Sequence, residues 1–391
     1  MQFETGAKLS GYVNKSKTMK VIHLVPVPGF YSMHQGMGGH VAHAYGMIRG
    51  LERCGCSVRT LAAEPASALD GWMPQGVVVP FQRGVMGRQR WSMALLRHLE
   101  QMCHEQPPDV LYVRYSQQFA WWLPAVKRIL RPARVVLEVN SFAAQRWKLA
   151  GLLESRIFKS ADVILAISEI VADDLRRILP RAFHSRILVL PNGVDIERFQ
   201  GVTSRKLPGS GAYDVAYVGI LKFGHGLENI VTAARRMEQQ VPEVVFHLVG
   251  DGPAMRHLQE LSAGLRNFRL HGAVGFDQVP PILKGADVLL YTTSRSLAFQ
   301  SPIKLFEYMA SGRAIVAMHT PATEWLLGGG ANGRLIPIGD VTALQEAILA
   351  YRDEPTTGER HGRMAAAAAA ANHTWESRAR DLLLHLQITK K

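Results

Sequence analysis

Two charged residues near position 305 have the types and the spacing needed to bind a nucleoside diphosphate. Lys304 and Glu307 are three residues apart, which on a helix places them on one face, about 4.5 Å apart along the axis. The Lys304 cation and the backbone amides near Ile303 could bind a diphosphate, and the Glu307 carboxylate could accept both hydroxyls of a ribose. An ordinary surface helix with a Lys–Glu pair would show the same spacing, so both interpretations stay open here.

The residues around this pair predict a short helix that starts near Ser301. Ser301 favours the N-cap position, Pro302 the first helical position, and Gly312 the position just after the last turn. The segment follows a loop after a predicted strand that ends at Tyr291. The start of the helix should therefore lie at the carboxyl edge of a parallel sheet, where α/β proteins bind ligands.

Two loops carry residues that could approach the same phosphates. The loop from Gly219 to Gly226 contains Lys222 and His225, which could deliver positive charge from the end of a strand. Gly38 and Gly39 open a helix after the first strand, and their amides could closely approach a phosphate. Each loop could equally be a solvent-exposed turn.

Several other kinds of site lack their sequence signatures. The glycine-rich loops at 36–41 and 250–255 have Val41 and Met255 where a dinucleotide-binding loop needs its third glycine. The histidines show no zinc-binding spacing, and there is no GxSxG segment for an acyl-transfer nucleophile. We therefore expect chemistry without a dedicated metal or a bound cofactor.

The elements that must position these residues form two similar series of strands and helices. Short apolar runs alternate with longer helical patterns, which predicts βαβ units and parallel sheets. The first series is expected at 20–27 (strand), 40–53 (helix), 57–62, 109–113, 134–139 and 162–167 (strands). The second is expected at 214–218 (strand), 227–236 (helix), 244–249 and 286–291 (strands), 302–311 (helix) and 314–317 (strand). Residues 201–212 have the composition of a linker.

This pattern predicts an α/β protein with two Rossmann-like domains that face each other across a cleft. We expect one domain at 19–200, a second at 213–371, and a C-terminal helix at 372–391 that packs back on the first. The alanine run 365–371 should be helical, because alanine is the best helix former. Residues 1–18 precede the first apolar run and are expected to be a disordered extension or to reflect a misplaced start.

Composition agrees with this organisation. A chain of 391 residues with 47% apolar residues is longer than the roughly 250 to 300 residues at which single cores stop growing. The three cysteines do not form a disulfide framework, which favours a reducing compartment. The sequence shows neither a secretory signal nor an apolar stretch of membrane-spanning length. We expect a cytoplasmic protein.

The positive charge is concentrated in the first half of the chain. The net charge is +13, and residues 1–200 contain 25 Lys and Arg against 15 Asp and Glu. This field suits a polyanion or an anionic membrane surface, although a soluble protein with a basic face would look the same. The basic amphipathic stretch 82–102 allows the same two interpretations: a surface helix with its apolar face in the core, or a contact with a membrane or an anionic acceptor.

The motifs together resemble a known family, the retaining glycosyltransferases of family four, which have the GT-B fold. The resemblance covers roughly residues 20 to 386 and depends on the order and spacing of five segments. These are Gly38-Gly39 with His43, Pro191 to Asp195 with Phe199, Gly219 to Gly226, Val249 to Pro253, and Ser301 to Lys304 with Glu307. In that family a nucleotide sugar binds mainly to the second domain, and the acceptor binds mainly to the first.

The resemblance also implies roles for individual residues. Glu307 would bind the donor ribose, Lys304 with Ser301 and Ile303 would hold the diphosphate, and Val274 would line the donor site. Lys222 and His225 match basic positions that stabilise the leaving group. The remaining positions implied by the resemblance are Gly38 and Gly39, in the loop that closes over the diphosphate, and Asn140, in the position of a catalytic histidine.

Two positions depart from the family pattern. Phe299 stands where the first glutamate of the family's carboxylate pair is usual, and Asn140 replaces the histidine. Asn140 can donate a hydrogen bond but cannot shuttle protons at neutral pH. Similar sequences with a Ser-Pro-x-Lys segment also lack the first glutamate, so we interpret Phe299 as a subgroup trait.

The resulting hypothesis is a glycosyltransferase that moves a sugar from a nucleotide-sugar donor to a glycan or lipid-linked acceptor with retention of configuration. Front-face attack is favoured over a covalent intermediate, and the acceptor would belong to cell-surface polysaccharide or glycolipid synthesis at the inner membrane face. A nucleotide-sugar-binding scaffold without catalysis is the main alternative, because of Phe299 and Asn140. A dinucleotide-dependent oxidoreductase is disfavoured by the missing glycines. Nucleic acid is not expected as a partner, because no aromatic stacking set is present.

Overall fold

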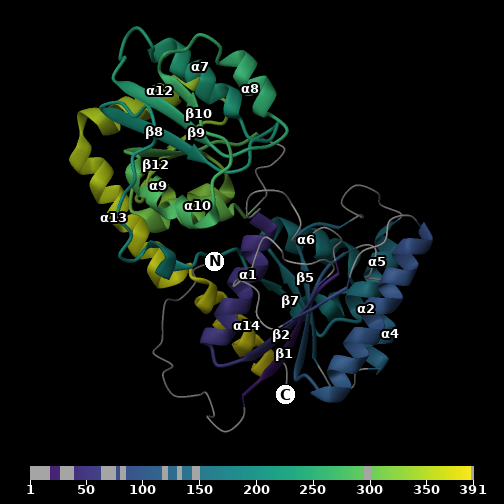
Figure 1. The fold of residues 1–391 in the computed structure, drawn as a ribbon. Helices are drawn as coiled ribbons and strands as arrows, with labels where there is room; N and C mark the ends of the chain where they lie inside the picture. The colour runs from purple at the N-terminus through teal and green to yellow at the C-terminus, as the bar shows by residue number, and fades with distance from the viewer. Residues whose placement is uncertain are drawn as a thin grey trace.

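The computed structural model describes residues 18–26, 39–62, 76–79, 85–116, 122–129, 134–142, 150–294 and 301–388, which form two α/β domains (Figure 1). The first domain contains a seven-stranded sheet in the order β3-β2-β1-β4-β5-β6-β7, with every pair parallel. Its strands are β1 (Lys20–Val25), β2 (Ser57–Ala62), β3 (Gly76–Val78), β4 (Val110–Arg114), β5 (Arg134–Val139), β6 (Val163–Ala166) and β7 (Ile187–Val189).

The second domain repeats this architecture with a six-stranded parallel sheet in the order β10-β9-β8-β11-β12-β13. Its strands are β8 (Tyr213–Val218), β9 (Val244–Val249), β10 (Phe268–Leu270), β11 (Val288–Tyr291), β12 (Ala314–Met318) and β13 (Arg334–Ile336). The predicted pair of Rossmann-like domains is therefore confirmed. In each sheet the strand order reverses beside the first strand, between β1 and β4 and between β8 and β11, and such switch points are where open α/β sheets bind ligands.

Helices cover both faces of each sheet. The first domain has α1 (Gly39–Arg53), α2 (Val85–Glu105), α4 (Leu123–Ile129), α5 (Ala150–Lys159), α6 (Glu169–Ile178) and the short 3-10 turn η2 (Arg181–Arg186). The second has α7 (Leu227–Met237), α8 (Met255–Leu261), η4 (Phe276–Gln278), α9 (Val279–Gly285), α10 (Ile303–Ser311), α11 (Pro321–Leu326), η6 (Gly328–Gly330) and α12 (Val341–Asp353). The turn after η2, η3 (Ile196–Phe199), packs against α9 and α10 of the second domain. None of the described helices has the length and apolar character needed to cross a membrane.

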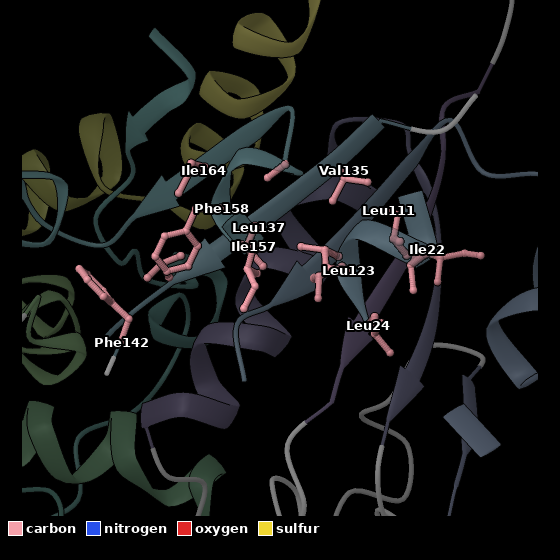
Figure 2. Close-up of a cluster of buried hydrophobic side chains, with 14 of the residues drawn as sticks. Ile22, Leu24, Leu111, Leu123, Val135, Leu137, Phe142, Ile157, Phe158 and Ile164 are labelled. Atoms are coloured by element: carbon pink, nitrogen blue, oxygen red, sulfur yellow. The ribbon is translucent and has the colours of Figure 1, made fainter. Parts of the chain in front are cut away.

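Most strand residues are apolar because both faces of each sheet are covered. In β1, Ile22 and Leu24 belong to the cluster beneath α2 and α5, whereas Val21 faces the opposite cluster beneath α1. Figure 2 shows the first cluster, in which Phe158 of α5 packs near the strand residues Leu137 and Ile164.

Helix α2 buries its apolar face in the same core. Trp91, Leu95 and Leu99 are at most 1% exposed, while Met86 and Met93 lie on its exposed side. The interpretation of this stretch as a surface helix is therefore confirmed, and its outer face still combines apolar and basic residues.

The last two helices connect the domains. Helix α13 (Pro355–Asn372), which contains the predicted alanine helix, packs on α10 of the second domain, whereas α14 (Trp375–Ile388) lies beside α1 of the first (Figure 1). Gly46 and Gly50 of α1 allow this close approach, since a Cβ at Gly50 would lie 2.3 Å from the carbonyl oxygen of Trp375. Residues 1–17 of the predicted extension lie outside the described residues.

Candidate functional site

The candidate site of the second domain lies at the start of α10, beside the switch point of the sheet. Helix α10 begins at Ile303, and Gly312 ends it in the left-handed conformation at φ 73°. The expected capping was wrong in detail, because Pro302 occupies the N-cap position. The hydroxyl of Ser301 instead accepts a hydrogen bond from the backbone amide of Asn192, at 3.0 Å. Pro302 has no side chain that could accept a hydrogen bond from the first helical amides, so the helix carries no side-chain cap there.

Lys304 points along α10 toward the end of β8. Its Nζ donates a short hydrogen bond to the hydroxyl of Tyr217 and lies 4.3 Å from the centre of that ring. Gly219 leaves room for this side chain, because a Cβ there would lie 3.3 Å from Nζ. Burial, with a further contribution from the charge of Lys222, lowers the pKa of Lys304 to about 7. The charge of Glu307 opposes this shift, but no carboxylate of the described residues forms an ion pair with the amine.

Lys222 and His225 lie close to the same amine, as the sequence predicted for their loop. Lys222 is exposed, and its charge influences both Lys304 and His225. His225 differs from the expectation that it carries positive charge, since burial and the nearby Lys304 lower its pKa to about 4. Its Nδ1 lies 3.1 Å from the carbonyl oxygen of Ile220, which can only accept. The Tyr217 hydroxyl lies 3.0 Å from the same Nδ1 but donates to the Ile220 carbonyl, so the neutral ring carries its proton on Nδ1 and presents Nε2 as an acceptor.

Glu307 is held by an arginine that sequence reasoning did not identify. Nη1 of Arg198, in η3, donates to Oε1 of Glu307 at 2.9 Å, and the guanidinium stacks 3.3 Å from the centre of the Phe276 ring. Arg198 also donates to the backbone carbonyl of Phe276 at 2.6 Å. Burial raises the pKa of Glu307, while Arg198 acts in the opposite direction. Val274 lies two residues before Phe276 in the loop after β10, and therefore close to this pair.

The first domain has a polar cluster of its own around Glu138 in β5. Glu138 is 1% exposed and accepts from the Tyr112 hydroxyl at 2.8 Å and from Nη1 of Arg114 at 2.7 Å. Nε2 of His43, in α1, lies 2.9 Å from Oε2, an ion-pair distance without hydrogen-bond alignment. Asn140 follows β5 and donates from Nδ2 to Oε1 at 2.9 Å. Burial would raise the pKa of Glu138, but the charges of His43 and Arg114 hold it well below its usual range.

A single asparagine connects the two clusters. Oδ1 of Asn192 lies 2.5 Å from Nδ1 of His43, and its Nδ2 donates to the backbone carbonyl of Ser301 at 2.6 Å. Nε of Arg378, in α14, donates to the carbonyl of Asn192 at 3.2 Å. A continuous series of polar contacts therefore extends from Glu138 in the first domain to the segment before α10 in the second.

The structure brings most of the predicted site residues into these two clusters. Lys304, Glu307, Lys222, His225, Ser301, Ile303 and Val274 surround the start of α10, and Asn140 belongs to the cluster of the first domain. Gly39 is the first residue of α1, whereas Gly38 and Phe299 lie outside the described residues. The residues that sequence reasoning gave no role are Arg198, Tyr217, Glu138 and Arg114, together with His43 and Asn192, which carried the resemblance without a function.

This arrangement can bind an anion and a pair of hydroxyls. An uncapped helix start and two lysines favour negative charge, and a carboxylate held by Arg198 can accept from vicinal hydroxyls. Over the described ranges, no group of three or more His, Cys, Asp or Glu side chains is placed to hold a metal ion. The expectation of metal-independent chemistry stays a prediction.

Comparison with known families gives matches over both domains. Residues 37–198 match the model described as Glycosyltransferase Family 4, and residues 212–353 match the model described as Glycosyl transferases group 1. Together the two matches cover most of the chain and both halves of the candidate site.

Individual proteins give the same result. The phosphatidyl-myo-inositol mannosyltransferase of Mycobacterium tuberculosis is 24% identical over 352 residues, which cover 86% of this chain and 90% of that protein. The structure of Anabaena HepE in complex with UDP-glucose has a TM-score of 0.71 at 19% identity, and covers 95% of this chain and 100% of that one. The apo form of the lipopolysaccharide outer core galactosyltransferase WaaB has a TM-score of 0.65 at 16% identity, with 95% and 99% covered. These structural likenesses show that the two domains have the GT-B arrangement.

Proposed function

Because the chain belongs to glycosyltransferase family 4, we propose that it moves a sugar from a nucleotide-sugar donor to a glycan or lipid-linked acceptor, with retention of configuration. The observation that carries the donor half of this proposal is the pair of charges on α10. Lys304 forms no ion pair within the described part of the chain and donates only to the Tyr217 hydroxyl, and Glu307 is held in place by Arg198. A nucleoside diphosphate has the complementary groups, with its phosphates at Lys304 and its ribose at Glu307.

In this proposal, positive charge stabilises the leaving diphosphate. Lys304, Lys222 and the amides at the start of α10 would meet the negative charge that develops as the bond to the sugar breaks. His225 would enter the reaction neutral, and its Nε2 would accept a hydrogen bond or take up a proton. Such preorganised electrostatic stabilisation is commonly the largest single contribution to catalysis.

Front-face attack by the acceptor hydroxyl is the favoured route to retention. Of the carboxylates in these two clusters, Glu307 is bound to Arg198, and Glu138 is buried among three hydrogen-bond donors and the ring of His43. Neither is placed as a nucleophile toward a sugar carbon. Anomeric analysis of the product by NMR would test retention, and inversion at the anomeric carbon would contradict it.

A lipid-linked acceptor is supported by the outer face of α2. Met86, Arg90, Met93 and Arg97 are all exposed and recur at helical spacing, so they form one stripe of apolar and basic side chains. The name of the mycobacterial relative also describes a lipid substrate. We propose that this stripe contacts an anionic membrane surface, with the protein acting on the cytoplasmic side in polysaccharide or glycolipid synthesis.

The donor proposal is tested by thermal shift with UDP-glucose, GDP-mannose, ADP-glucose, dTDP-glucose, NAD and NADP. A cognate donor at about 100 times its Kd should stabilise the protein by about 2.7 kcal/mol. Glu307→Ala should abolish this shift, whereas Glu359→Ala, an exposed glutamate on α13, should retain it. Stabilisation by NAD or NADP alone would contradict the proposal, and binding without any release of nucleoside diphosphate would favour the scaffold.

The membrane contact is tested by sedimentation with vesicles. Arg90→Glu combined with Arg97→Glu should weaken binding to anionic vesicles by about tenfold or more, since each basic residue near such a surface contributes about 1 kcal/mol. Arg266→Glu, at an exposed position of the second domain, is the control. Equal binding to anionic and zwitterionic vesicles at low salt would overturn this part of the proposal.

Metal independence is tested by chelation. With diphosphate stabilised by lysines and amides, EDTA should leave the rate of nucleoside diphosphate release within about twofold of its value without chelator. A rate that collapses with EDTA and returns with Mg²⁺ or Mn²⁺ would show that a metal ion bound with the donor is required.

A further inference from the structure

The buried carboxylate of Glu138 lies among four polar side chains. Its two oxygens face the hydroxyl of Tyr112, the guanidinium of Arg114, the amide of Asn140 and the ring of His43, at distances of 2.7 to 2.9 Å. The Arg114 guanidinium can only donate, and the charges of His43 and Arg114 hold the pKa of Glu138 well below its usual range, so Glu138 acts as an ionised carboxylate with no proton to donate. None of the five segments that carry the resemblance contains Glu138, and its role follows from these contacts.

This carboxylate determines which way the Asn140 amide faces. An asparagine side chain has a donor end and an acceptor end that are hard to distinguish by shape. Beside a carboxylate only the donor end is favourable, so Nδ2 faces Glu138 and Oδ1 faces away. That Oδ1 is hidden from solvent and has no hydrogen-bond partner within the described part of the chain. A buried acceptor without a partner is costly, and a bound substrate that supplies the donor would remove that cost.

Asn140 is connected through a series of polar contacts to the segment that leads into the donor site. Glu138 contacts His43, His43 contacts Asn192, and Asn192 makes two hydrogen bonds to Ser301. Asn140 follows β5 at the carboxyl edge of the sheet, the edge at which α/β proteins bind substrates. The unpartnered oxygen is therefore placed where a bound sugar or acceptor can supply a hydrogen-bond donor.

We propose that Glu138 is a positioning residue that turns Oδ1 of Asn140 toward the substrates, where it accepts a hydrogen bond from a substrate hydroxyl. This inference rests on the proposed glycosyl transfer. The hydroxyl belongs either to the acceptor or to the transferred sugar, since both present the same chemistry. Asn140 thus contributes an acceptor, which differs from the donor role expected from its residue type.

The test compares Asn140→Ala, Glu138→Gln and the double variant by release of nucleoside diphosphate, with octyl glycoside acceptors present, from the sugar nucleotide that stabilises the wild type. The amide introduced by Glu138→Gln can donate to Oδ1 of Asn140, which would let the asparagine amide turn over and lose its orientation. Each single variant should lower kcat at least tenfold, with the donor KM and the donor thermal shift within about twofold of wild type. The double variant should be no slower than Asn140→Ala, because Glu138 acts through Asn140.

Two further variants serve as controls for folding and for the chemical change. Glu138→Asp retains the charge that balances Arg114 and His43 but shortens the reach to Asn140, so it covers the case in which Glu138→Gln does not fold. It should lower kcat in the same direction. Glu154→Gln makes the same chemical change at another buried glutamate of the first domain, hydrogen-bonded to Tyr115, and should leave kcat unchanged.

Two assays identify the source of the hydroxyl. Donor hydrolysis is measured without acceptor, and transfer is measured with a panel of octyl glycosides. If the hydroxyl is on the transferred sugar, Asn140→Ala slows both reactions, and if it is on the acceptor, only transfer is slowed. The inference would be overturned if Asn140→Ala kept the wild-type kcat in both assays. It would also be overturned if the loss of kcat in the double variant equalled the product of the two single losses. Binding of donor by the wild type without turnover would instead overturn the proposed function, and this inference with it.

Discussion

Lys304 is a partly buried amine without an ion pair among the described residues, and such a group favours binding of an anionic ligand. Its nearest polar partner is a tyrosine hydroxyl, and Lys222 adds further positive charge nearby. The carboxylate three residues along the helix is bound to Arg198 instead. The amine therefore loses hydration without gaining a full charge partner, which disfavours its charged form until an anion arrives.

Binding of a diphosphate should accordingly be coupled to proton uptake. The pKa of Lys304 is about 7 without ligand, and a neighbouring diphosphate would raise it. At pH 8 the amine is mostly neutral, so donor binding should take up a proton, whereas at pH 6 it is already mostly charged. Calorimetry in buffers of different ionisation enthalpy measures this uptake. It should disappear in Lys304→Met, and a binding enthalpy independent of buffer at pH 8 would contradict the assignment.

Arg198 is a second residue whose role can be measured. Arg198→Met removes the cation that opposes the raised pKa of Glu307, so the carboxyl should protonate at a higher pH than in wild type. Loss of this charged hydrogen bond should weaken donor binding about tenfold or more, and binding should weaken further as the pH falls. Donor titrations between pH 5 and 8 measure both effects. Arg236→Met, at an exposed position of α7, should behave like wild type.

At the scale of elements, the close packing of α1 on α14 depends on two glycines. A Cβ at Gly46 would meet the indole of Trp375, whereas a Cβ at Gly50 would meet its backbone carbonyl at 2.3 Å. A side chain can move aside more easily than a backbone can. Gly50 is thus the position at which the two helices most strictly require a glycine.

Gly50→Ala should therefore destabilise the protein despite the better helix propensity of alanine. Alanine gains about 1 kcal/mol over glycine in a helix, but a forced backbone shift costs about 1 to 3 kcal/mol. We expect a net loss of stability, seen as a lower thermal midpoint, and a smaller loss for Gly46→Ala. Gly275→Ala, where the nearest atom would be 3.8 Å away, is the control. An unchanged midpoint for Gly50→Ala would show that the two helices can separate freely.

At the scale of the whole molecule, the C-terminal segment makes the two domains depend on each other. Helix α13 belongs to the second domain, yet Leu382 and Leu386 of α14 are buried in the first, in the cluster with Met47 and Leu51 of α1. Between them, Thr374 pairs with Val194. The final residues of the chain therefore complete the core of the domain in which the chain begins.

Leu382→Ala should consequently lower the stability of the first domain and leave that of the second unchanged. Removing a leucine side chain that is 1% exposed costs about 2 to 5 kcal/mol. Hydrogen exchange followed by mass spectrometry should show faster exchange in α1 and unchanged exchange in α7. Leu384→Ala, on the same helix at 40% exposure, should leave both unchanged. If hydrogen exchange became faster in α7 to the same extent as in α1, the two domains would unfold as one unit.

Local sequence patterns predicted the longer strands and the donor-side pair, but not the three-residue strands β3, β7, β10 and β13. Apolar runs covered on both faces defined the longer strands, and the three-residue spacing of Lys304 and Glu307 alone placed both on one face of α10. The sequence could not predict contacts between residues that are far apart in the chain, because spacing says nothing about them. Arg198 meets Glu307 across 109 residues, and Asn192 meets His43 across 149. The tertiary structure also decided the charge states, since burial and neighbouring charges left His225 neutral and Glu138 ionised.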